Sequence, residues 1–350
     1  MAVQKINIDD FITQAATALI IDVRSPGEFE HAHIISAVNL PLFSNEERAI
    51  IGTTYKKQSR EAAIKVGLPL FGNKLLPMIE TVETWVSEKQ KLNNGIKPAL
   101  FVHCWRGGMR SAAVAWLLDL YGFKVFQLTG GYKTYRNWVL AQFIKPYPIK
   151  VLGGYTGSGK TEILHVLKKR NHEVIDLEGL AHHKGSAFGA IGQLTQPSQE
   201  MFENKLADAL CHTNTDQKTL WVEDESQRIG LVIIPVEFLK QMRNSVCHFF
   251  VIPFEERLQF IMEGYGEFEI QGLIEATLRI EKRLGGLETK NAIQFFNEKK
   301  IKDAFAILLK YYDKWYEKNA LSTAKTKLAV QSIPSDKVDA ENNALLLEKI

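Results

Sequence analysis

Short apolar runs alternate with amphipathic stretches along the first half of the chain. The runs at 17–24, 37–40 and 98–104 are bounded by polar residues, which predicts buried strands. The stretch 111–123 predicts an apolar helix, and 124–140 predicts a strand, a glycine turn and a helix. Strands that alternate with helices predict a mainly parallel sheet that helices cover on both faces.

The second half repeats this pattern after a break at 144–150, where two prolines interrupt the helical periodicity. Helical patterns dominate from Phe254 onward and fade from about Asn319. Strands are expected at 148–154, 172–179, 219–226 and 246–253, with a helix at 159–170. We therefore predict an α/β domain at 8–142, a second α/β domain at 148–318 whose C-terminal part is helical, and a loosely structured tail at 319–350.

The composition is that of a globular protein, with 350 residues, 45% hydrophobic and 24% charged. No apolar run approaches the roughly 20 residues that span a bilayer, and the N-terminus lacks a signal-peptide pattern, so we expect a cytoplasmic protein. The three cysteines lack the spacing of a zinc site or of a disulfide framework. Residues 1–145 carry 17 Lys and Arg against 12 Asp and Glu, which weakly favours an anionic partner for the first half.

The stretch FVHCWRGGMRS, 101–111, places a cysteine directly after a predicted strand. Its two glycines allow successive backbone N–H groups to form an anion cradle, and the following helix directs its positive end at the same place. Both effects stabilise a thiolate. We predict Cys104 as the reactive residue, Arg110 as the clamp of a bound anion and Arg106 as its assistant. The five residues between Cys104 and Arg110 fit a phosphatase loop as well as a sulfur carrier.

The stretch GGYTGSGKT, 153–161, lies between a predicted strand and a predicted helix and has P-loop spacing. In such a loop the backbone N–H groups surround a di- or triphosphate, the lysine adds charge and the last hydroxyl can hold Mg²⁺. The predicted phosphate-binding residues are Gly154, Tyr155, Thr156, Gly157, Ser158, Gly159, Lys160 and Thr161.

Other polar residues near these loops are weaker candidates, since each also fits an ordinary cap or solvated surface. Four acids at strand ends are candidates for a base or a metal ligand: Asp176, Glu178, Glu223 and Glu225. The candidates for substrate contacts are Trp105, His183, Lys184, Arg279 and Arg283.

The sequence around the cysteine, IIDVRSPGEFEHAHIISAVNLP, resembles the early signature of rhodanese, whose cysteine carries a chalcogen. A rhodanese-like sheet followed by a P-loop sheet in one chain is similar to the tRNA 2-selenouridine synthase family. The motifs that carry this resemblance are DVRSPGEFEHAHI, RAIIGTTYKKQSREAAIKVGL, FVHCWRGGMRS, LTGGYKTYR, GGYTGSGKTEIL, DLEGLAHHKGSAFG, VEDESQRIG and RLGG.

The resemblance implies a transferase that acts on 2-thiouridine at the wobble position, U34, of tRNA. A geranyl group from geranyl diphosphate is first placed on the sulfur, and selenium from selenophosphate then replaces the S-geranyl group to give 2-selenouridine. Cys104 would carry selenium as a selanyl-cysteine intermediate, and the glycine loop would bind geranyl diphosphate. We expect contact with the tRNA anticodon loop, no tightly bound cofactor, Mg²⁺ as a candidate ion, no membrane association and a monomer.

Two other functions fit the same motifs. One is a cysteine-dependent phosphatase fused to a P-loop kinase, although the sequence shows no evident loop with a general acid. The other is a persulfide carrier that catalyses no reaction on tRNA by itself.

Overall fold

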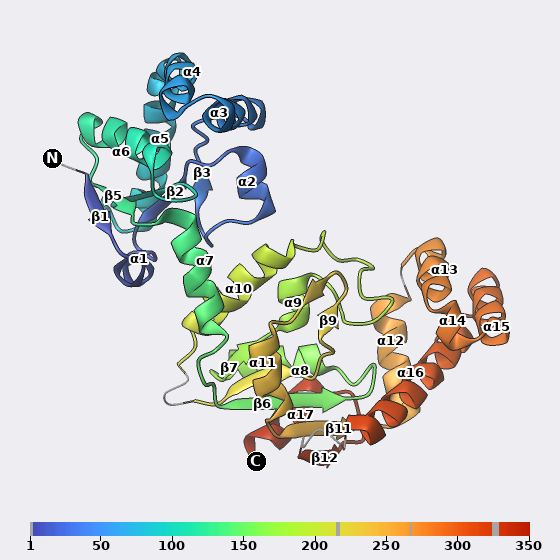
Figure 1. Cartoon of the computed structure of the whole chain (residues 1–350). Coiled ribbons are helices and arrows are strands. Elements are labelled where there is room, and N and C mark those ends of the chain that lie inside the picture. The colour runs from blue at the N-terminus through green and yellow to red at the C-terminus, as the bar shows by residue number, and fades with distance from the viewer. Residues whose placement is uncertain (1–2, 215–217, 267, 324–328) are drawn as a thin grey trace. The chain divides into compact units, whose positions relative to one another are not determined.

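The computed structural model describes residues 3–214, 218–266, 268–323 and 329–350 (Figure 1). The chain forms two compact units, Met1–Ala141 and Gln142–Ile350. Each unit contains a five-stranded sheet whose neighbouring strands are all parallel. The predicted architecture of two α/β units with parallel sheets and a helical C-terminal part is confirmed.

The first sheet has the strand order β1-β5-β4-β2-β3. The central strand β4 is buried along its whole length because neighbouring strands and helices surround it. Parallel strands place their carboxyl ends at one edge of the sheet, where open α/β sheets bind ligands. The strands are β1 (Gln4–Ile6), β2 (Leu19–Asp22), β3 (Val38–Asn39), β4 (Leu100–His103) and β5 (Val125–Leu128).

Helices connect these strands and supply the rest of the core. Helix α5 packs its buried residues Met78, Val82 and Val86 into the same hydrophobic cluster as β2 and β4. Helices α3 and α4 pack against each other and lengthen the connection between β3 and β4 (Figure 1). The helices are α1 (Ile8–Gln14), α2 (Pro26–His31), α3 (Asn45–Lys57), α4 (Arg60–Gly72), α5 (Leu75–Leu92), α6 (Met109–Tyr121) and α7 (Gly131–Gln142).

The second sheet has the strand order β12-β11-β6-β8-β7, so its first strand in sequence is central. A short antiparallel hairpin, β9 and β10, follows β8. The predicted strand at 172–179 is wrong in its second half, because Asp176 caps a helix that begins at Leu177. The strands are β6 (Ile149–Gly154), β7 (Glu173–Ile175), β8 (Leu220–Glu223), β9 (Arg228–Ile229), β10 (Val232–Ile233), β11 (Cys247–Val251) and β12 (Val330–Pro334).

The helices of the second unit cover this sheet and build a helical part with its own hydrophobic cluster. That cluster joins α12, α13, α15 and α16 through residues such as Leu258, Leu273, Phe296 and Leu308. The helices are α8 (Lys160–Lys169), α9 (Leu177–Ala181), α10 (Gln199–Cys211), α11 (Val236–Arg243), α12 (Phe254–Tyr265), α13 (Ile270–Arg279), α14 (Glu281–Leu284), α15 (Gly286–Asn297), α16 (Ile301–Thr323) and α17 (Ala340–Glu348).

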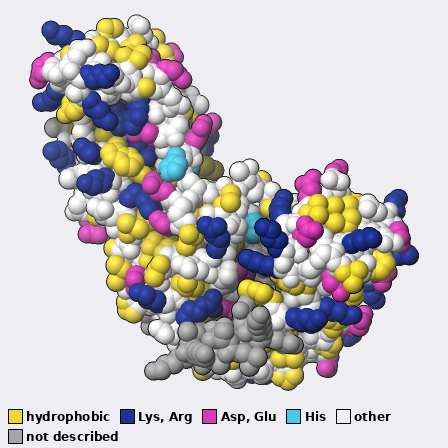
Figure 2. All heavy atoms as spheres, turned by 45° about the vertical axis from the view of Figure 1, so that its right-hand side comes forward, with side chains coloured by type: hydrophobic (Ala, Val, Ile, Leu, Met, Phe, Trp, Pro, Cys, Tyr) yellow, Lys and Arg dark blue, Asp and Glu magenta, His cyan; other side chains and the backbone are white. Residues whose placement is uncertain are grey.

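Charged side chains and apolar groups are interspersed over the face shown in Figure 2. Within the described part of the chain, no helix has both the length and the apolar character that a membrane crossing requires.

The prediction of a loosely structured tail at 319–350 is wrong for residues 319–323, which belong to α16, and for residues 330–348, while residues 324–328 lie outside the described part of the chain. Strand β12 pairs in parallel with β11 along its whole length, and helix α17 packs on α8. Ile333 and Leu347 are buried in the same cluster as Leu152 and Phe250 of the sheet. Between Val330 and Asn343 the apolar residues are few, so the local periodicity there is weak although Ile333 lies in the core.

We predict that Leu347→Ala lowers the free energy of unfolding by about 2–5 kcal/mol, because the substitution leaves a cavity at a position that is 2% exposed. Urea denaturation followed by circular dichroism measures the change. The matched control is Leu345→Ala, since Leu345 is 42% exposed on the same helix and its loss should be nearly neutral. Equal effects of both substitutions would contradict a structural role for α17.

Candidate active sites

Cys104 lies directly after β4, at the carboxyl edge of the first sheet. Its side chain is buried, and the Ser111 hydroxyl donates a hydrogen bond to the sulfur at 3.3 Å. Gly107 adopts φ +62°, a conformation that favours glycine, and turns the loop toward α6. The structure thus places the thiol inside a glycine turn that ends at a helix N-terminus.

A second glycine turn, after β5, supports the cysteine loop from outside. A Cβ atom on Gly131 would collide with the Cys104 carbonyl oxygen and the Gly107 nitrogen, so only glycine allows this approach. The Tyr132 N–H donates to the Cys104 carbonyl at 2.8 Å. The amide of Gln127 donates to the Gly107 carbonyl at 2.9 Å and to the Ser111 hydroxyl at 2.8 Å. Gln127 was not predicted as a site residue, although a glutamine inside an apolar strand was a usable signal.

The pKa of the Cys104 thiol lies below its ordinary value. Burial by itself would raise this pKa, but the Ser111 hydroxyl, the Ser111 and Arg106 backbone N–H groups and the charge of Arg110 together outweigh it. A thiol with a lowered pKa is a better nucleophile at neutral pH. The loop therefore has the electrostatic property that a reactive cysteine requires.

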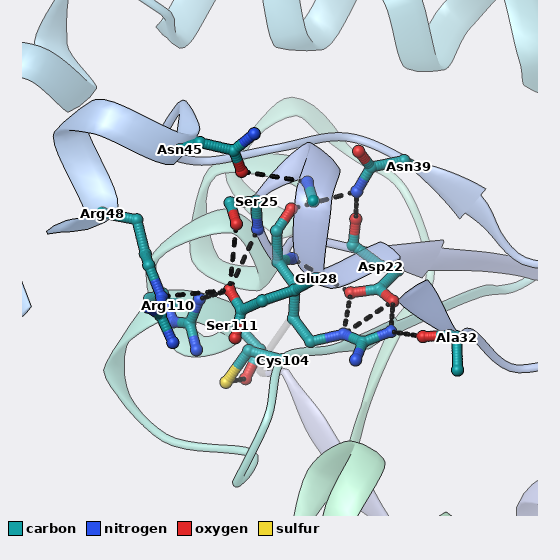
Figure 3. A network of polar contacts seen from close by, with 12 residues as sticks. Asp22, Ser25, Glu28, Ala32, Asn39, Asn45, Arg48, Cys104, Arg110 and Ser111 are labelled. Atoms are coloured by element: carbon teal, nitrogen blue, oxygen red, sulfur yellow. Dashed lines mark hydrogen bonds and ion pairs between the residues drawn. The ribbon is translucent and has the colours of Figure 1, made fainter. Parts of the chain in front are cut away.

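Arg110 is paired with a carboxylate of the protein itself. Its Nη1 donates to Glu28 Oε2 at 2.9 Å, and the same oxygen accepts from the Ser25 N–H at 3.2 Å (Figure 3). Arg48 Nε lies 3.6 Å from that oxygen. Burial by itself would raise the pKa of Glu28, but its contacts with Arg110, Ser25 and Arg48 lower it, so Glu28 is ionised at neutral pH. Glu28 is a site residue that the sequence analysis did not identify.

The rhodanese-like DVR signature is a buried scaffold beside this loop. Arg24 is fully buried, and its Nε and Nη2 groups donate to the Asp22 carboxylate (Figure 3). Nη2 also donates to the Ala32 carbonyl at 2.8 Å, and the guanidinium lies 3.8 Å from the centre of the Tyr132 ring. Breaking such a buried pair would leave an uncompensated charge. The pair therefore fixes the end of β2 against the turn that supports Cys104.

The two remaining candidates of the first unit are at the surface of the loop. Arg106 is exposed, and Trp105 is 37% exposed with its ring 5.6 Å from the Tyr132 ring. Both side chains are therefore accessible to a ligand that approaches Cys104.

The P-loop of the second unit connects β6 to α8 as predicted. Gly157 and Gly159 adopt φ values of +81° and +71°. A Cβ atom on Gly157 would lie 2.9 Å from the Arg257 carbonyl oxygen, so helix α12 packs directly against the loop. The buried Arg257 side chain donates to the Thr156 carbonyl at 3.1 Å and forms a bidentate pair with Asp313. The loop is therefore held by α12 and α16, which the motif alone did not reveal.

Lys160 begins helix α8 and points back over the P-loop, where its Nζ donates to the Gly154 carbonyl at 3.3 Å. Burial by itself would lower the pKa of Lys160, but Tyr316, Glu178 and other nearby acids raise it. The amine therefore stays charged, as a lysine that binds phosphate must.

Three of the predicted acids gather beside Lys160 and Thr161. The Thr161 hydroxyl donates to Glu178 Oε2 at 3.2 Å, and the Glu178 N–H donates to Glu223 Oε1 at 2.7 Å. Burial and the neighbouring carboxylates raise the pKa values of Glu223 and Glu225 well above the ordinary value, so both favour the neutral form. Across the described ranges, no group of three or more His, Cys, Asp and Glu side chains is arranged to hold a metal ion.

Asp176 has a local structural role instead. Its carboxylate accepts from the Gly179 N–H at 2.6 Å and thereby caps α9, and its other oxygen lies 3.1 Å from His165 Nε2.

The P-loop, Glu178 and Glu225 line one cavity of about 2330 Å³. The four candidate contacts of the second unit line it too: His183, Lys184, Arg279 and Arg283. Figure 2 shows Lys and Arg side chains beside a hollow in the second unit. Helix α16 adds tyrosines to the cavity wall, which the sequence analysis did not identify although they follow helical spacing.

Family models match both units of the chain. Residues 8–137 match the rhodanese-like domain, and residues 147–339 match the tRNA 2-selenouridine synthase AAA domain. The fold and the two loops define a protein in which a rhodanese-like domain is joined to a P-loop domain.

Curated relatives match over most of the chain. It is 38% identical over 267 residues to the tRNA 2-selenouridine synthase of Nitrosomonas europaea. The matched region is 74% of this chain and 67% of that protein. It is 35% identical over 332 residues to the tRNA 2-selenouridine synthase of Hydrogenovibrio crunogenus, which covers 85% of this chain and 88% of that protein. The chain belongs to the tRNA 2-selenouridine synthase family, and the resemblance seen in its motifs is confirmed.

We predict that Ser111→Ala raises the pKa of Cys104, because the sulfur loses the hydrogen bond that favours its thiolate. The rate of iodoacetamide alkylation, followed from pH 5 to pH 10 by mass spectrometry of the Cys104 peptide, reports this pKa. The control is Ser87→Ala, since Ser87 is exposed on α5. An unchanged alkylation profile in Ser111→Ala would show that the hydroxyl does not tune the thiol.

We predict that Glu223→Gln stabilises the protein increasingly as the pH rises. The raised pKa of Glu223 means that the folded state binds a proton that the unfolded state releases above the ordinary pKa of 4.5. The stability of the wild type therefore falls as the pH rises from 4.5 toward the folded-state pKa, by up to about 1.4 kcal/mol per pH unit. Glutamine removes this dependence.

Urea denaturation at pH 5.5 and pH 8 measures the difference between the two proteins. Glu237→Gln is the control, since the Glu237 side chain is 52% exposed. A difference in stability that is the same at both pH values would mean that Glu223 is ionised in the folded protein.

Proposed function

We propose that the protein converts 2-thiouridine at the wobble position, U34, of tRNA to 2-selenouridine. The observation that carries this proposal is a buried thiol of lowered pKa in one unit and a P-loop with a charged lysine in the other. Both occur in a chain that belongs to the tRNA 2-selenouridine synthase family. The family name includes tRNA, which supports tRNA as the substrate of this protein.

In the proposed first step, the P-loop binds geranyl diphosphate. The sulfur of 2-thiouridine attacks the first carbon of the geranyl group, a C–S bond forms, and the C–O bond breaks with its electron pair leaving on the diphosphate. The backbone N–H groups and Lys160 stabilise the negative charge of that leaving group. The Ser158 hydroxyl is 1% exposed and has no partner in the described part of the chain, which leaves it available to a phosphate oxygen.

Mg²⁺ is compatible with this site as an ion that arrives with the diphosphate. Thr161 and Glu178 would hold it from the protein side, and it would neutralise part of the charge of the leaving group.

In the proposed second step, selenium from selenophosphate replaces the S-geranyl group. The net reaction uses one water, forms the C–Se bond, breaks the C–S bond and releases geranylthiol and phosphate. The alkylated sulfur leaves more readily than the sulfur of a thiocarbonyl. We assign Arg110 and Arg106 as the residues that attract the selenophosphate anion. We assign Cys104 as the selenium carrier, in the form of a selanyl-cysteine intermediate. Because the selenium of selenophosphate is at the selenide level, formation of the S–Se bond consumes a two-electron oxidant such as a disulfide, and a thiol returns the two electrons when the S–Se bond breaks and selenium remains on the nucleobase.

The phosphatase alternative requires a protonated general acid near Cys104. Glu28 is the carboxylate that contacts Arg110, and its lowered pKa makes it an acceptor rather than a proton donor. The structure therefore offers less support for phosphatase chemistry than for transfer of selenium.

We predict that Cys104→Ala abolishes selenation but still yields S-geranylated tRNA, while Lys160→Ala lowers the rate of geranylation at least 100-fold, in line with the loss of a residue that stabilises transition-state charge. Thiolated tRNA is incubated with geranyl diphosphate and selenophosphate, and its nucleosides are analysed by mass spectrometry. Lys168→Ala, at the far end of helix α8, is the control for the loss of a lysine.

Formation of 2-selenouridine at the wild-type rate by both variants would contradict the proposal. Hydrolysis of an aryl phosphate that depends on Cys104 would instead favour the phosphatase. Transfer of sulfur to Cys104 without any change in tRNA would favour the persulfide carrier.

A further inference from the structure

One face of helix α16 forms an aromatic and apolar stripe along the cavity that contains the P-loop. Its members recur at intervals of three and four residues, which places them on the same side of the helix. We call this set the α16 stripe: Phe305, Leu308, Leu309, Tyr312, Trp315 and Tyr316, all of which line the cavity.

The α16 stripe begins at the P-loop. The Tyr316 ring lies 6.0 Å from the Tyr155 ring of the loop, and the Tyr316 hydroxyl is close enough to Lys160 to raise the pKa of the lysine. Asp313, on the same helix, pairs with the Arg257 side chain that bonds the loop. A phosphate group in the P-loop would therefore lie next to the Tyr316 end of the stripe.

The other end of the α16 stripe is closed by aromatic packing. The Phe305 ring lies 6.0 Å from both the Phe188 ring and the Tyr265 ring. From Tyr316 to Phe305 the helix rises about 16 Å, at about 1.5 Å per residue. The stripe is thus an apolar wall of limited length with a phosphate loop at one end.

The exposed fraction of the side chains falls along the α16 stripe from the P-loop end to the closed end. Trp315 is 41% exposed, whereas Leu308 and Phe305 are 1% and 4% exposed. The buried members belong to the core that joins α12, α13 and α15, but Trp315 is too exposed to be explained by that core. An exposed tryptophan beside a phosphate loop is available to an apolar group of a ligand.

We propose that the α16 stripe binds the hydrocarbon tail of a prenyl diphosphate whose diphosphate group lies in the P-loop. The tail runs from Tyr316 toward Phe305, and the packed ring of Phe305 limits its length. This assignment rests on the proposed use of geranyl diphosphate. It matches a ligand with a strongly charged head and a wholly apolar tail to a cavity that has a phosphate loop at one end of an apolar wall.

A nucleobase is the other group that a P-loop ligand would carry. It presents ring nitrogens and amino or carbonyl groups that need polar partners when buried. The α16 stripe offers the hydroxyls of Tyr312 and Tyr316 and the indole N–H of Trp315, which are few for a nucleobase, and the Tyr312 hydroxyl already accepts from the Ala187 N–H at 3.3 Å. The stripe therefore favours a prenyl tail over a nucleobase.

Calorimetric titration of the full chain with geranyl diphosphate, inorganic diphosphate and ATP tests the proposal. We expect the wild type to bind geranyl diphosphate at least tenfold more tightly than inorganic diphosphate, because the tail buries apolar surface. Trp315→Ala should lower the affinity for geranyl diphosphate about fivefold to tenfold and leave that for inorganic diphosphate unchanged. Trp116→Ala is the matched control, since Trp116 is 54% exposed on α6 of the first unit.

A second variant tests the closed end of the stripe. Phe305→Ala should increase the affinity for farnesyl diphosphate, which has the longer tail, at least fivefold relative to that for geranyl diphosphate. A melting curve with a single transition near that of the wild type confirms that this variant is folded before it is titrated.

Each failure has a distinct meaning. If geranyl diphosphate binds tightly and both Trp315→Ala and Phe305→Ala leave all affinities unchanged, the tail lies elsewhere and this inference is wrong, while the proposed donor stands. If geranyl diphosphate binds no more tightly than inorganic diphosphate, the inference and the proposed donor both fail. If ATP binds most tightly and loses affinity in Trp315→Ala, the stripe binds a nucleobase and the inference is overturned.

Discussion

Both sites depend on a glycine-containing backbone turn that residues outside the turn hold in place. A turn of this kind exposes N–H groups to an anion because glycine adopts conformations that other residues avoid. The same freedom makes such a turn unstable unless neighbouring groups fix it. In the first unit Gln127 and the Gly130–Gly131 turn hold the cysteine loop. In the second unit Arg257, paired with Asp313, holds the P-loop.

In each cradle a carboxylate of the protein lies beside the positive charge. Glu28 accepts from Arg110 in the first unit, and Glu178 lies beside Thr161 and Lys160 in the second. Such pairs keep cationic side chains in defined positions, but an incoming anion must compete with the resident carboxylate. In the second unit burial and the neighbouring Glu178 raise the pKa of Glu225, which makes its ionised form less favourable beside the loop.

The sequence was sufficient to predict the two parallel sheets, because buried strands, glycine loops and apolar helices each leave a local pattern. It was also sufficient to locate both loops, since their function requires fixed spacing within about ten residues. Glu28 and Asp313 were not predicted, because their importance comes from contacts with Arg110 and Arg257, which are distant in sequence. A single sequence does not show which residues that are far apart along the chain become neighbours in the fold.

The role of Arg110 was likewise only partly predictable, because it depends on a contact with a residue that is distant in sequence. Its type and place in the motif indicated a side chain that binds an anion, and the structure shows that an internal carboxylate is already bound to it. The segment 330–348 was misjudged for the opposite reason, because its strand is short and mostly exposed, with Ile333 as its buried residue. Pairing with a neighbouring strand, rather than local apolar pattern, makes it part of the sheet.

The position of this last strand has a consequence for how the protein is made. Strand β12 is the edge of the sheet that contains the P-loop, and Val338 packs so close to Gly159 that a side chain there would meet it at 2.7 Å. During synthesis the central strand β6 leaves the ribosome long before these residues exist. The P-loop can therefore reach its final packing only when translation has passed Val338, and an mRNA that is cut short upstream of that codon yields a second unit whose phosphate loop lacks part of its support.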